Sequence, residues 1–133
     1  MMSKSEKTDS QWRELLDDEQ YRVTRQAGTE KAFSGEYVNH SENGDYLCVC
    51  CQNTLFSSNN KFESGCGWPS FSSQIEHGVV THHEDLSHGM DRTEVRCQSC
   101  DAHLGHIFDD GPAPNGFRYC INSVALNFVK KEE

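Results

Sequence analysis

Seven cysteines carry most of the chemistry that this 133-residue chain could perform. Four of them form two C-x-x-C pairs, Cys48 with Cys51 and Cys97 with Cys100. In each pair two thiolates converge on one side of a tight turn, and two such turns supply the four sulfur ligands of a tetrahedral zinc ion. A site with four protein ligands has no open position for a substrate, so we predict one structural Zn²⁺.

Two other interpretations of these cysteines fit less well. One pair could be a thioredoxin-like redox motif, but the surrounding sequence lacks the βαβ pattern that such a motif needs. His82-His83-Glu84 followed by the second pair faintly resembles the zinc deaminase signature. However, Arg96 replaces the expected proline, and the first cysteine pair would have no role.

Three thiols remain once the four predicted ligands are removed: Cys50, Cys66 and Cys120. We expect Cys50 to point to the face of its turn opposite the metal. Cys66 lies between two glycines, which leave a thiol accessible for exchange with another sulfur. Cys120 lies in a strand-like run two residues after Arg118, a cation that would favour the thiolate. Taken alone, the Cys120 segment is better explained as a strand that buries a small hydrophobic residue. For Cys66 the alternative is a loop cysteine without a partner.

Two histidines follow the second cysteine pair directly. His103 and His106 would point to opposite faces of a regular strand, because side chains alternate. If Gly105 marks a β-bulge, both could line one pocket as a proton donor and an orienting group. Trp68 is a rigid aromatic residue beside Cys66, and it fits a substrate-facing wall and a core position equally well.

Two short N-terminal helices precede a β-rich remainder. Ser10 is expected to cap the first helix. Asp17, with Gln20 three residues later, is expected to open the second, which would end at Gly28. From Phe33 onward, short apolar and β-branched runs alternate with turn residues, which is typical of an antiparallel β domain. The runs cover residues 46–50, 54–56, 78–81, 93–97, 103–108, 117–121 and 125–129.

The chain is short enough to form one domain, which we place at residues 10–129 between a disordered tail (1–9) and a polar tail (130–133). Asn43-Gly44-Asp45 has the composition of a tight hairpin turn. The formal net charge of −9 argues against nucleic acid or an anionic membrane as a partner. No secretory signal or membrane-spanning run is visible. We therefore expect a cytoplasmic protein, in which cysteines serve metal binding or thiol chemistry rather than disulfide scaffolding.

These motifs, in this order, resemble those of the methionine-R-sulfoxide reductases of the MsrB type. The resemblance runs from about Leu15 to Phe128 and includes both cysteine pairs, which are similar to the zinc-bearing branch. Cys50 departs from the pattern, because an aliphatic residue is more usual there. The matching segments are residues 28–30, 33–37, 55–58, 64–71, 92–97, 103–112 and 118–123.

The resemblance implies a mainly β fold of two antiparallel sheets with short N-terminal helices, stabilised by zinc away from the active site. It implies that Cys120 is the nucleophile that attacks the sulfoxide sulfur and becomes a sulfenic acid. Cys66 would then attack the sulfenic acid to form a disulfide, which thioredoxin would reduce. His103, His106 and Asn122 would bind and protonate the sulfoxide oxygen.

Trp68 would pack against the methyl group of the substrate and help to select the R epimer. We also assign Phe71 and Arg118 to the substrate-binding surface. The implied function is repair of oxidised methionine in peptides and proteins. The sequence leaves the oligomeric state open, and we take a monomer as the default. The alternative is a zinc-stabilised binding module without catalysis, which would need neither a thiol at Cys120 nor a second one at Cys66.

Overall fold

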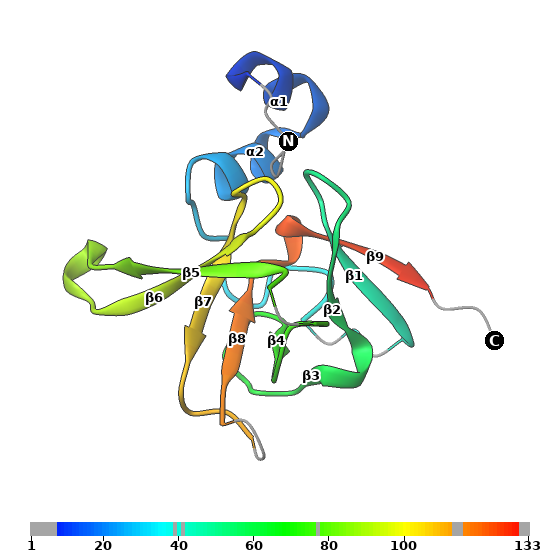
Figure 1. Cartoon of the computed structure of the whole chain (residues 1–133), viewed down its shortest axis with the longest axis vertical. Coiled ribbons are helices and arrows are strands. Elements are labelled where there is room, and N and C mark those ends of the chain that lie inside the picture. The colour runs from blue at the N-terminus through cyan, green and yellow to red at the C-terminus, as the bar shows by residue number, and fades with distance from the viewer. Residues whose placement is uncertain (1–7, 39, 41, 77, 113–115, 131–133) are drawn as a thin grey trace.

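The computed structural model describes residues 8–38, 40, 42–76, 78–112 and 116–130. The predicted tails therefore lie largely outside the described residues. Two helices come first, α1 (Asp9–Leu15) and α2 (Asp18–Arg25), and nine strands follow in this part of the chain (Figure 1). The strands are β1 (Gly44–Cys48), β2 (Thr54–Ser57), β3 (Lys61–Phe62), β4 (Ser70–Phe71), β5 (Val80–Asp85), β6 (Arg92–Cys97), β7 (His103–Phe108), β8 (Arg118–Ile121) and β9 (Leu126–Lys130). Short 3₁₀ turns are η1 (Ser58–Asn60), η2 (Ser87–Gly89) and η3 (Ser123–Ala125).

The strands form two antiparallel sheets. One has the order β2-β1-β9 and the other the order β3-β4-β8-β7-β6-β5. Both helices lie at one end of the molecule, at the top of Figure 1, and the three-stranded sheet lies at its right. The predicted fold class is confirmed: a mainly β protein with two antiparallel sheets and short N-terminal helices.

The helices begin at capping boxes. The Asp17 side chain accepts from the Gln20 N–H at 2.8 Å, and the Gln20 side chain accepts in return from the Asp17 N–H, as predicted. The predicted Ser10 cap was wrong, because Thr8 forms a complete box with Gln11 and so starts α1 earlier. Helix α2 ends at Arg25, before the expected stop at Gly28.

Each predicted run overlaps an observed strand. Strands β3 and β4 were not predicted, because two residues are too few to produce an alternating pattern. The hairpin prediction at Asn43-Gly44-Asp45 was wrong. Gly44 is instead the first residue of β1 and pairs with Lys130 of β9, and no strand precedes it in the described residues. A Cβ at this glycine would lie 2.3 Å from the Val129 carbonyl oxygen, so close strand approach explains the glycine.

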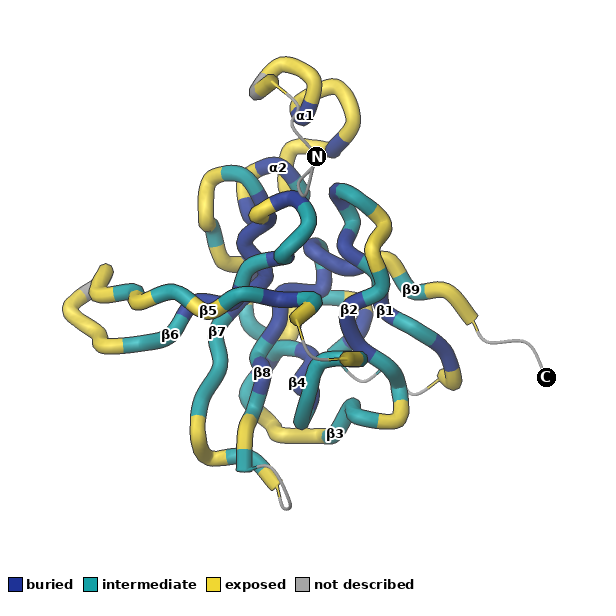
Figure 2. The backbone as a smooth tube through the Cα atoms, viewed as in Figure 1, coloured by how far each residue is buried: buried dark blue, intermediate teal, exposed yellow. Residues whose placement is uncertain are grey.

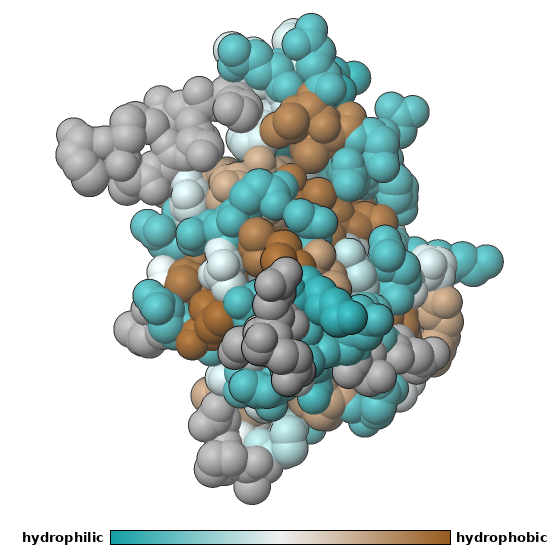
Figure 3. Space-filling view, turned by 90° about the vertical axis from the view of Figure 1, so that its right-hand side faces the viewer, coloured by the Kyte–Doolittle hydropathy of each residue, from teal (hydrophilic) through white to brown (hydrophobic). Residues whose placement is uncertain are grey.

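Aromatic side chains from both sheets build the core. Phe71 stacks on Phe56 with ring centroids 4.5 Å apart, and Tyr46 of the other sheet meets Phe71 edge-on at 5.2 Å. Buried residues follow the inner strands in Figure 2. On the side shown in Figure 3, hydrophobic side chains lie in patches interrupted by polar ones.

A β-bulge in β7 decides how the two predicted histidines are oriented. Val95 of β6 pairs with Gly105, but the next residue, Arg96, pairs with His103, so Leu104 is the extra residue. The bulge turns His103 and His106 to the same face, with ring centroids 5.6 Å apart. The bulge that the sequence left open at Gly105 is therefore present, with the neighbouring residue Leu104 as the extra residue.

Gly105 also allows β7 and β8 to approach. A Cβ there would lie 2.0 Å from the carbonyl oxygen of Cys120, a backbone atom that cannot move away alone. We therefore expect Gly105→Ala to lower the free energy of unfolding by about 1–3 kcal/mol through overpacking, measured by urea denaturation.

Gly28→Ala is the matched control. Its added Cβ would lie 2.7 Å from the end of the flexible Arg22 side chain, and the nearest backbone atom, the Arg22 carbonyl oxygen, is 3.0 Å away rather than 2.0 Å. Gly28→Ala should lower the free energy of unfolding clearly less than Gly105→Ala does. Equal losses in the two variants would contradict the assignment of Gly105 to strand approach.

Candidate active site

Two thiols meet at the centre of the larger sheet. Cys120 lies on β8, directly opposite Ser70 of β4 on one side and His106 of β7 on the other. Cys66 lies in the loop before β4, and its Sγ is 3.4 Å from the Sγ of Cys120. Both glycines beside Cys66 have positive φ, 78° at Gly65 and 102° at Gly67, a conformation that few other residues adopt. The sharp path of this loop brings the two sulfur atoms together.

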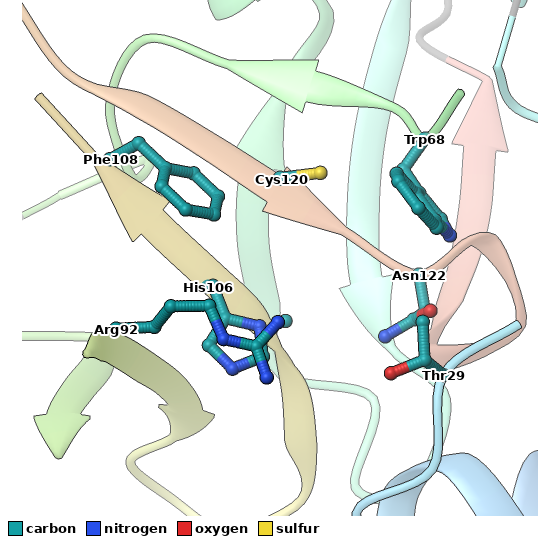
Figure 4. A pocket seen from close by; sticks show the side chains of 8 residues that line it. Thr29, Trp68, Arg92, His106, Phe108, Cys120 and Asn122 are labelled. Atoms are coloured by element: carbon teal, nitrogen blue, oxygen red, sulfur yellow. The ribbon is translucent and has the colours of Figure 1, made fainter. Parts of the chain in front are cut away.

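A pocket open to solvent surrounds Cys120 (Figure 4). Cys120 lies between Trp68 on one side and Phe108 on the other, and His106 with Arg92 forms a further part of the wall. The lining residues are Thr29, Trp68, Arg92, Gly105, His106, Phe108, Cys120 and Asn122. An apolar wall, a thiol and a nearby imidazole suit a small ligand that carries one polar acceptor.

The two histidines differ in their position relative to the pocket. His106 lines it, and its Nε2 lies 2.7 Å from the carboxylate of Asp85. His103 is not a lining residue: 5% of its surface is exposed, its Nδ1 lies 2.6 Å from Glu94, and its Nε2 is buried without a hydrogen-bond partner among the described residues. Burial lowers the pKa of His103, although Glu94 acts in the opposite direction. The structure therefore brings only His106 into direct reach of a ligand in the pocket.

Trp68 and Asn122 are both fixed by Glu30. The indole Nε1 of Trp68 donates to the Glu30 carbonyl oxygen at 3.0 Å. The Glu30 N–H donates to the side-chain oxygen of Asn122 at 3.0 Å, and the Asn122 amide donates to the Leu104 carbonyl oxygen. The Trp68 ring therefore stands as a wall of the pocket rather than as part of the core.

The structure does not bring Phe71 or Arg118 into the pocket wall. Phe71 is fully buried in the aromatic core. Arg118 binds Asp110 at 2.9 Å and lies over the ring of Phe108, 4.4 Å from its centroid. Arg118 is thus held just outside the wall, where it acts on the thiols through its charge.

The two thiols have different proton affinities. Burial raises the pKa of Cys66, but hydrogen bonds from Ser64 and Ser70 outweigh it and lower the pKa to about 7. Burial raises the pKa of Cys120 above its ordinary value, and negative charge on Cys66 adds to the rise, while Arg118 opposes it. Arg118 thus favours the Cys120 thiolate as expected, but burial first and Cys66 second outweigh it, so Cys66 carries the first negative charge of the pair.

The four predicted metal ligands form a compact cluster. The sulfur atoms of Cys48, Cys51, Cys97 and Cys100 all lie within 4.8 Å of one another, and two of the pairs are 3.6 Å apart. Sulfur ligands at about 2.3 Å from a tetrahedral ion lie about 3.8 Å apart, so the cluster fits such an ion closely. The predicted clustering is confirmed, and the four residues could hold a metal.

Cys50 is not one of the four clustered residues, and its expected orientation away from the metal stays a prediction. It is buried, and the groups that lower its pKa most are Cys100 and Cys48. Thr24 of α2 also contacts it. Helix α2 therefore lies beside Cys50.

Comparison with known proteins agrees with this geometry. The SelR domain profile matches residues 16–130. The peptide methionine sulfoxide reductase MsrB of Hahella chejuensis is 57% identical over 127 residues, which cover 96% of this chain and 91% of that protein. The chain belongs to the MsrB family. The MsrB proteins of Acinetobacter baumannii and Acinetobacter baylyi are 53% and 52% identical over 132 residues, which cover 99% of this chain and 95% of each relative.

Several residues of this MsrB-family site were not predicted as such. Thr29, Arg92 and Phe108 line the pocket, and Glu30 and Asp85 hold its walls. Most of them lie in segments that matched the family, but their individual roles depend on contacts that no local pattern reveals.

In the described residues, no helix is long and apolar enough to cross a membrane.

The hydroxyl groups around Cys66 generate a testable pH dependence. A thiolate is alkylated and a thiol is not, so the rate should rise with pH through the pKa of Cys66. We expect a midpoint near pH 7 in a Cys120→Ser background, and a higher midpoint in Ser70→Ala, which removes a hydrogen bond to the thiolate. Mass spectrometry of the Cys66 peptide after iodoacetamide pulses measures this.

Ser72→Ala is the control, because the hydroxyl of Ser72 donates to the Asn60 carbonyl oxygen rather than to Cys66. Its midpoint should stay at the value of the background protein. A Ser70→Ala midpoint that did not move upward would show that the hydroxyl does not stabilise the thiolate.

Metal removal should unfold the domain. The cluster joins the ends of β1 and β6 to two turns, so loss of the ion leaves four buried or half-buried thiols without their common partner. We expect a strong chelator to lower the melting temperature by more than about 10 °C, followed by circular dichroism with metal content measured in parallel.

Cys51→Ser should lose the metal, whereas Cys50→Ser should retain it and serve as the control. An unchanged melting curve after complete loss of the metal would contradict a structural role for the cluster.

Proposed function

We propose that this protein reduces methionine-R-sulfoxide in peptides and proteins to methionine, and that thioredoxin returns it to the reduced state. Peptide methionine sulfoxide reduction is the activity in the names of its MsrB relatives. The observation that carries the proposal is the pair of thiols 3.4 Å apart, one of which, Cys120, lines the pocket. Two thiols at this distance can pass from a sulfenic acid to a disulfide without a large rearrangement.

The first step transfers oxygen from the substrate to Cys120. A sulfoxide sulfur is a poor electrophile until its oxygen is protonated, so an acid must lie beside the nucleophile. His106 is directly opposite Cys120 in the sheet and faces the same pocket. As the Cys120 thiolate attacks the sulfoxide sulfur, His106 gives a proton to the oxygen. The oxygen then moves to the Cys120 sulfur as the substrate S–O bond breaks, the S–S bond formed by the attack breaks, methionine leaves, and Cys120 becomes a sulfenic acid.

This step balances as sulfoxide plus thiol giving thioether plus sulfenic acid. The sulfoxide is reduced and the Cys120 sulfur is oxidised by two electrons. The proton released by the Cys120 thiol replaces, through solvent, the proton that His106 donates. Arg118 favours the Cys120 thiolate, since it lowers the pKa that burial and Cys66 raise.

The second step forms a disulfide. The Cys66 thiolate attacks the sulfenic sulfur of Cys120, the S–O bond breaks, and the oxygen leaves as water. Hydrogen bonds from Ser64 and Ser70 keep Cys66 reactive near neutral pH. A dithiol of the thioredoxin class then supplies the two electrons that reopen the disulfide. Such a reductant is characteristic of the cytoplasm, where we place the reaction, and we retain a monomer as the working unit.

We further propose that the ion held by Cys48, Cys51, Cys97 and Cys100 is a single Zn²⁺. Four thiolates in a tetrahedral arrangement are the ligand set that structural zinc prefers. A Zn²⁺ bound there would cross-link the two sheets and would take no part in catalysis. Every step described above is carried by residues outside this cluster.

A binding module without catalysis is the competing function. It would explain the cluster and the pocket, but it gives no reason for a second thiol within 3.4 Å of the first. The proposed reductase needs both thiols, and it needs the imidazole that faces them.

Separated R and S epimers of a methionine sulfoxide peptide, assayed with thioredoxin as the reductant, test the proposal. We expect the wild-type protein to reduce the R epimer. Cys120→Ser should abolish turnover and retain the fold. Cys66→Ser should release about one methionine per protein and then stop, because no disulfide forms for thioredoxin to reduce.

Cys50→Ser is the matched thiol control and should turn over normally. Reduction of the S epimer alone would overturn the proposed substrate. Sustained thioredoxin-linked turnover by Cys66→Ser would overturn the assignment of the resolving thiol.

A further inference from the structure

One carboxylate contacts the imidazole that faces the reacting thiol. Asp85 is the last residue of β5, and its Oδ2 lies 2.7 Å from Nε2 of His106. Strand β5 is not adjacent to β7 in the sheet, because β6 lies between them. The Asp85 side chain must therefore extend past β6 to contact His106. Strand pairing alone does not place it there.

The carboxylate of Asp85 is held from both sides. Its Oδ1 accepts from the backbone N–H of Ser87 at 3.0 Å and from the Ser87 hydroxyl at 2.6 Å. Its Oδ2 is shared between His106 and the guanidinium of Arg92, whose NH2 lies 3.7 Å away. Hydrogen bonds from Ser87 and then His106 hold the pKa of the Asp85 carboxyl well below its usual range, so the group is an anion. A carboxylate fixed in this way can orient an imidazole.

The contact decides which ring nitrogen of His106 faces the substrate. An ionised carboxylate only accepts hydrogen bonds, so Nε2 of His106 must carry a proton. The remaining nitrogen, Nδ1, has no hydrogen-bond partner among the described residues and belongs to a ring that lines the pocket. If His106 is doubly protonated, Nδ1–H is its free donor.

We propose that Asp85 is a positioning residue that directs proton donation through Nδ1 of His106. The inference rests on the proposed function. When Nδ1 gives its proton to the sulfoxide oxygen, His106 is left as the neutral Nε2–H tautomer. This is the tautomer that the hydrogen bond to Asp85 stabilises, so the product state of proton transfer is already oriented. His103, which binds Glu94 through Nδ1, does not line the pocket, so we assign this role to His106.

Asp85→Asn is the test, because the two side chains have the same shape. The carbonyl oxygen of the substituted side chain can keep both hydrogen bonds from Ser87, while its amide would face Nε2 as a donor and favour the opposite, Nδ1–H tautomer. We expect the single-turnover rate of methionine formation to fall about 10- to 100-fold, with KM changed less than about two-fold. We expect the His106 signals in proton–nitrogen correlation spectra to change from the Nε2–H to the Nδ1–H pattern.

Asp91→Asn is the matched control, because Asp91 is an exposed aspartate of the same hairpin. It should keep both the rate and the tautomer of the wild-type protein. A single-turnover rate of Asp85→Asn within about two-fold of wild type would overturn the inference, and so would an unchanged Nε2–H pattern. Failure of the proposed function is distinct, because it would appear as a wild-type protein that reduces neither epimer, and the tautomer comparison would still test the Asp85 contact.

Discussion

The site depends on Glu30, a buried residue that forms four hydrogen bonds through its carboxylate and its backbone. Glu30 is 2% exposed, and its carboxylate accepts from the backbone N–H of Ser123 at 2.9 Å and of Val124 at 3.1 Å. Its own N–H holds Asn122, and its carbonyl oxygen holds Trp68. A buried carboxylate is costly unless its oxygens are hydrogen-bonded. Glu30 therefore joins the turn after β8, the loop before β4 and the segment after α2 at one point.

Strand pairing adds the reacting groups to this frame. Cys120 lies between Ser70 and His106 across the sheet, so the thiol, the hydroxyl that contacts Cys66 and the imidazole share one face. Without the bulge at Leu104, His103 and His106 would point to opposite faces. The bulge and the bare backbone of Gly105 place one imidazole in the pocket and the other beside it.

The fold class and the composition of the site could be predicted to a large extent from short-range signals. The paired cysteines have a spacing that is tied to one geometry, and the glycine between the two histidines marked the bulge. The capping box of Asp17 and Gln20 is likewise a signal between residues close together in the sequence. Where two local signals competed, as at Thr8 and Ser10, the one that satisfies more backbone donors determines the start of the helix.

The remaining features depend on contacts between distant segments. Nothing near Phe71 distinguishes a pocket wall from a core position, and the stack on Phe56 decides it. Glu30 and Asp85 look like ordinary charged residues, and their partners lie far away in the sequence. The raised pKa of Cys120 likewise arises from the proximity of Cys66, which follows only from the folded loop, together with burial.

The short distance between Cys66 and Cys120 has a kinetic consequence. In the proposed cycle the sulfenic acid on Cys120 faces two competing fates, which are capture by a thiol or further oxidation to a sulfinic acid that ordinary reductants do not reverse. A thiol held 3.4 Å away reacts as though it were present at a very high concentration, far above that of any oxidant in solution. The loop that carries Cys66 would thus protect the protein from the oxidants whose damage it repairs.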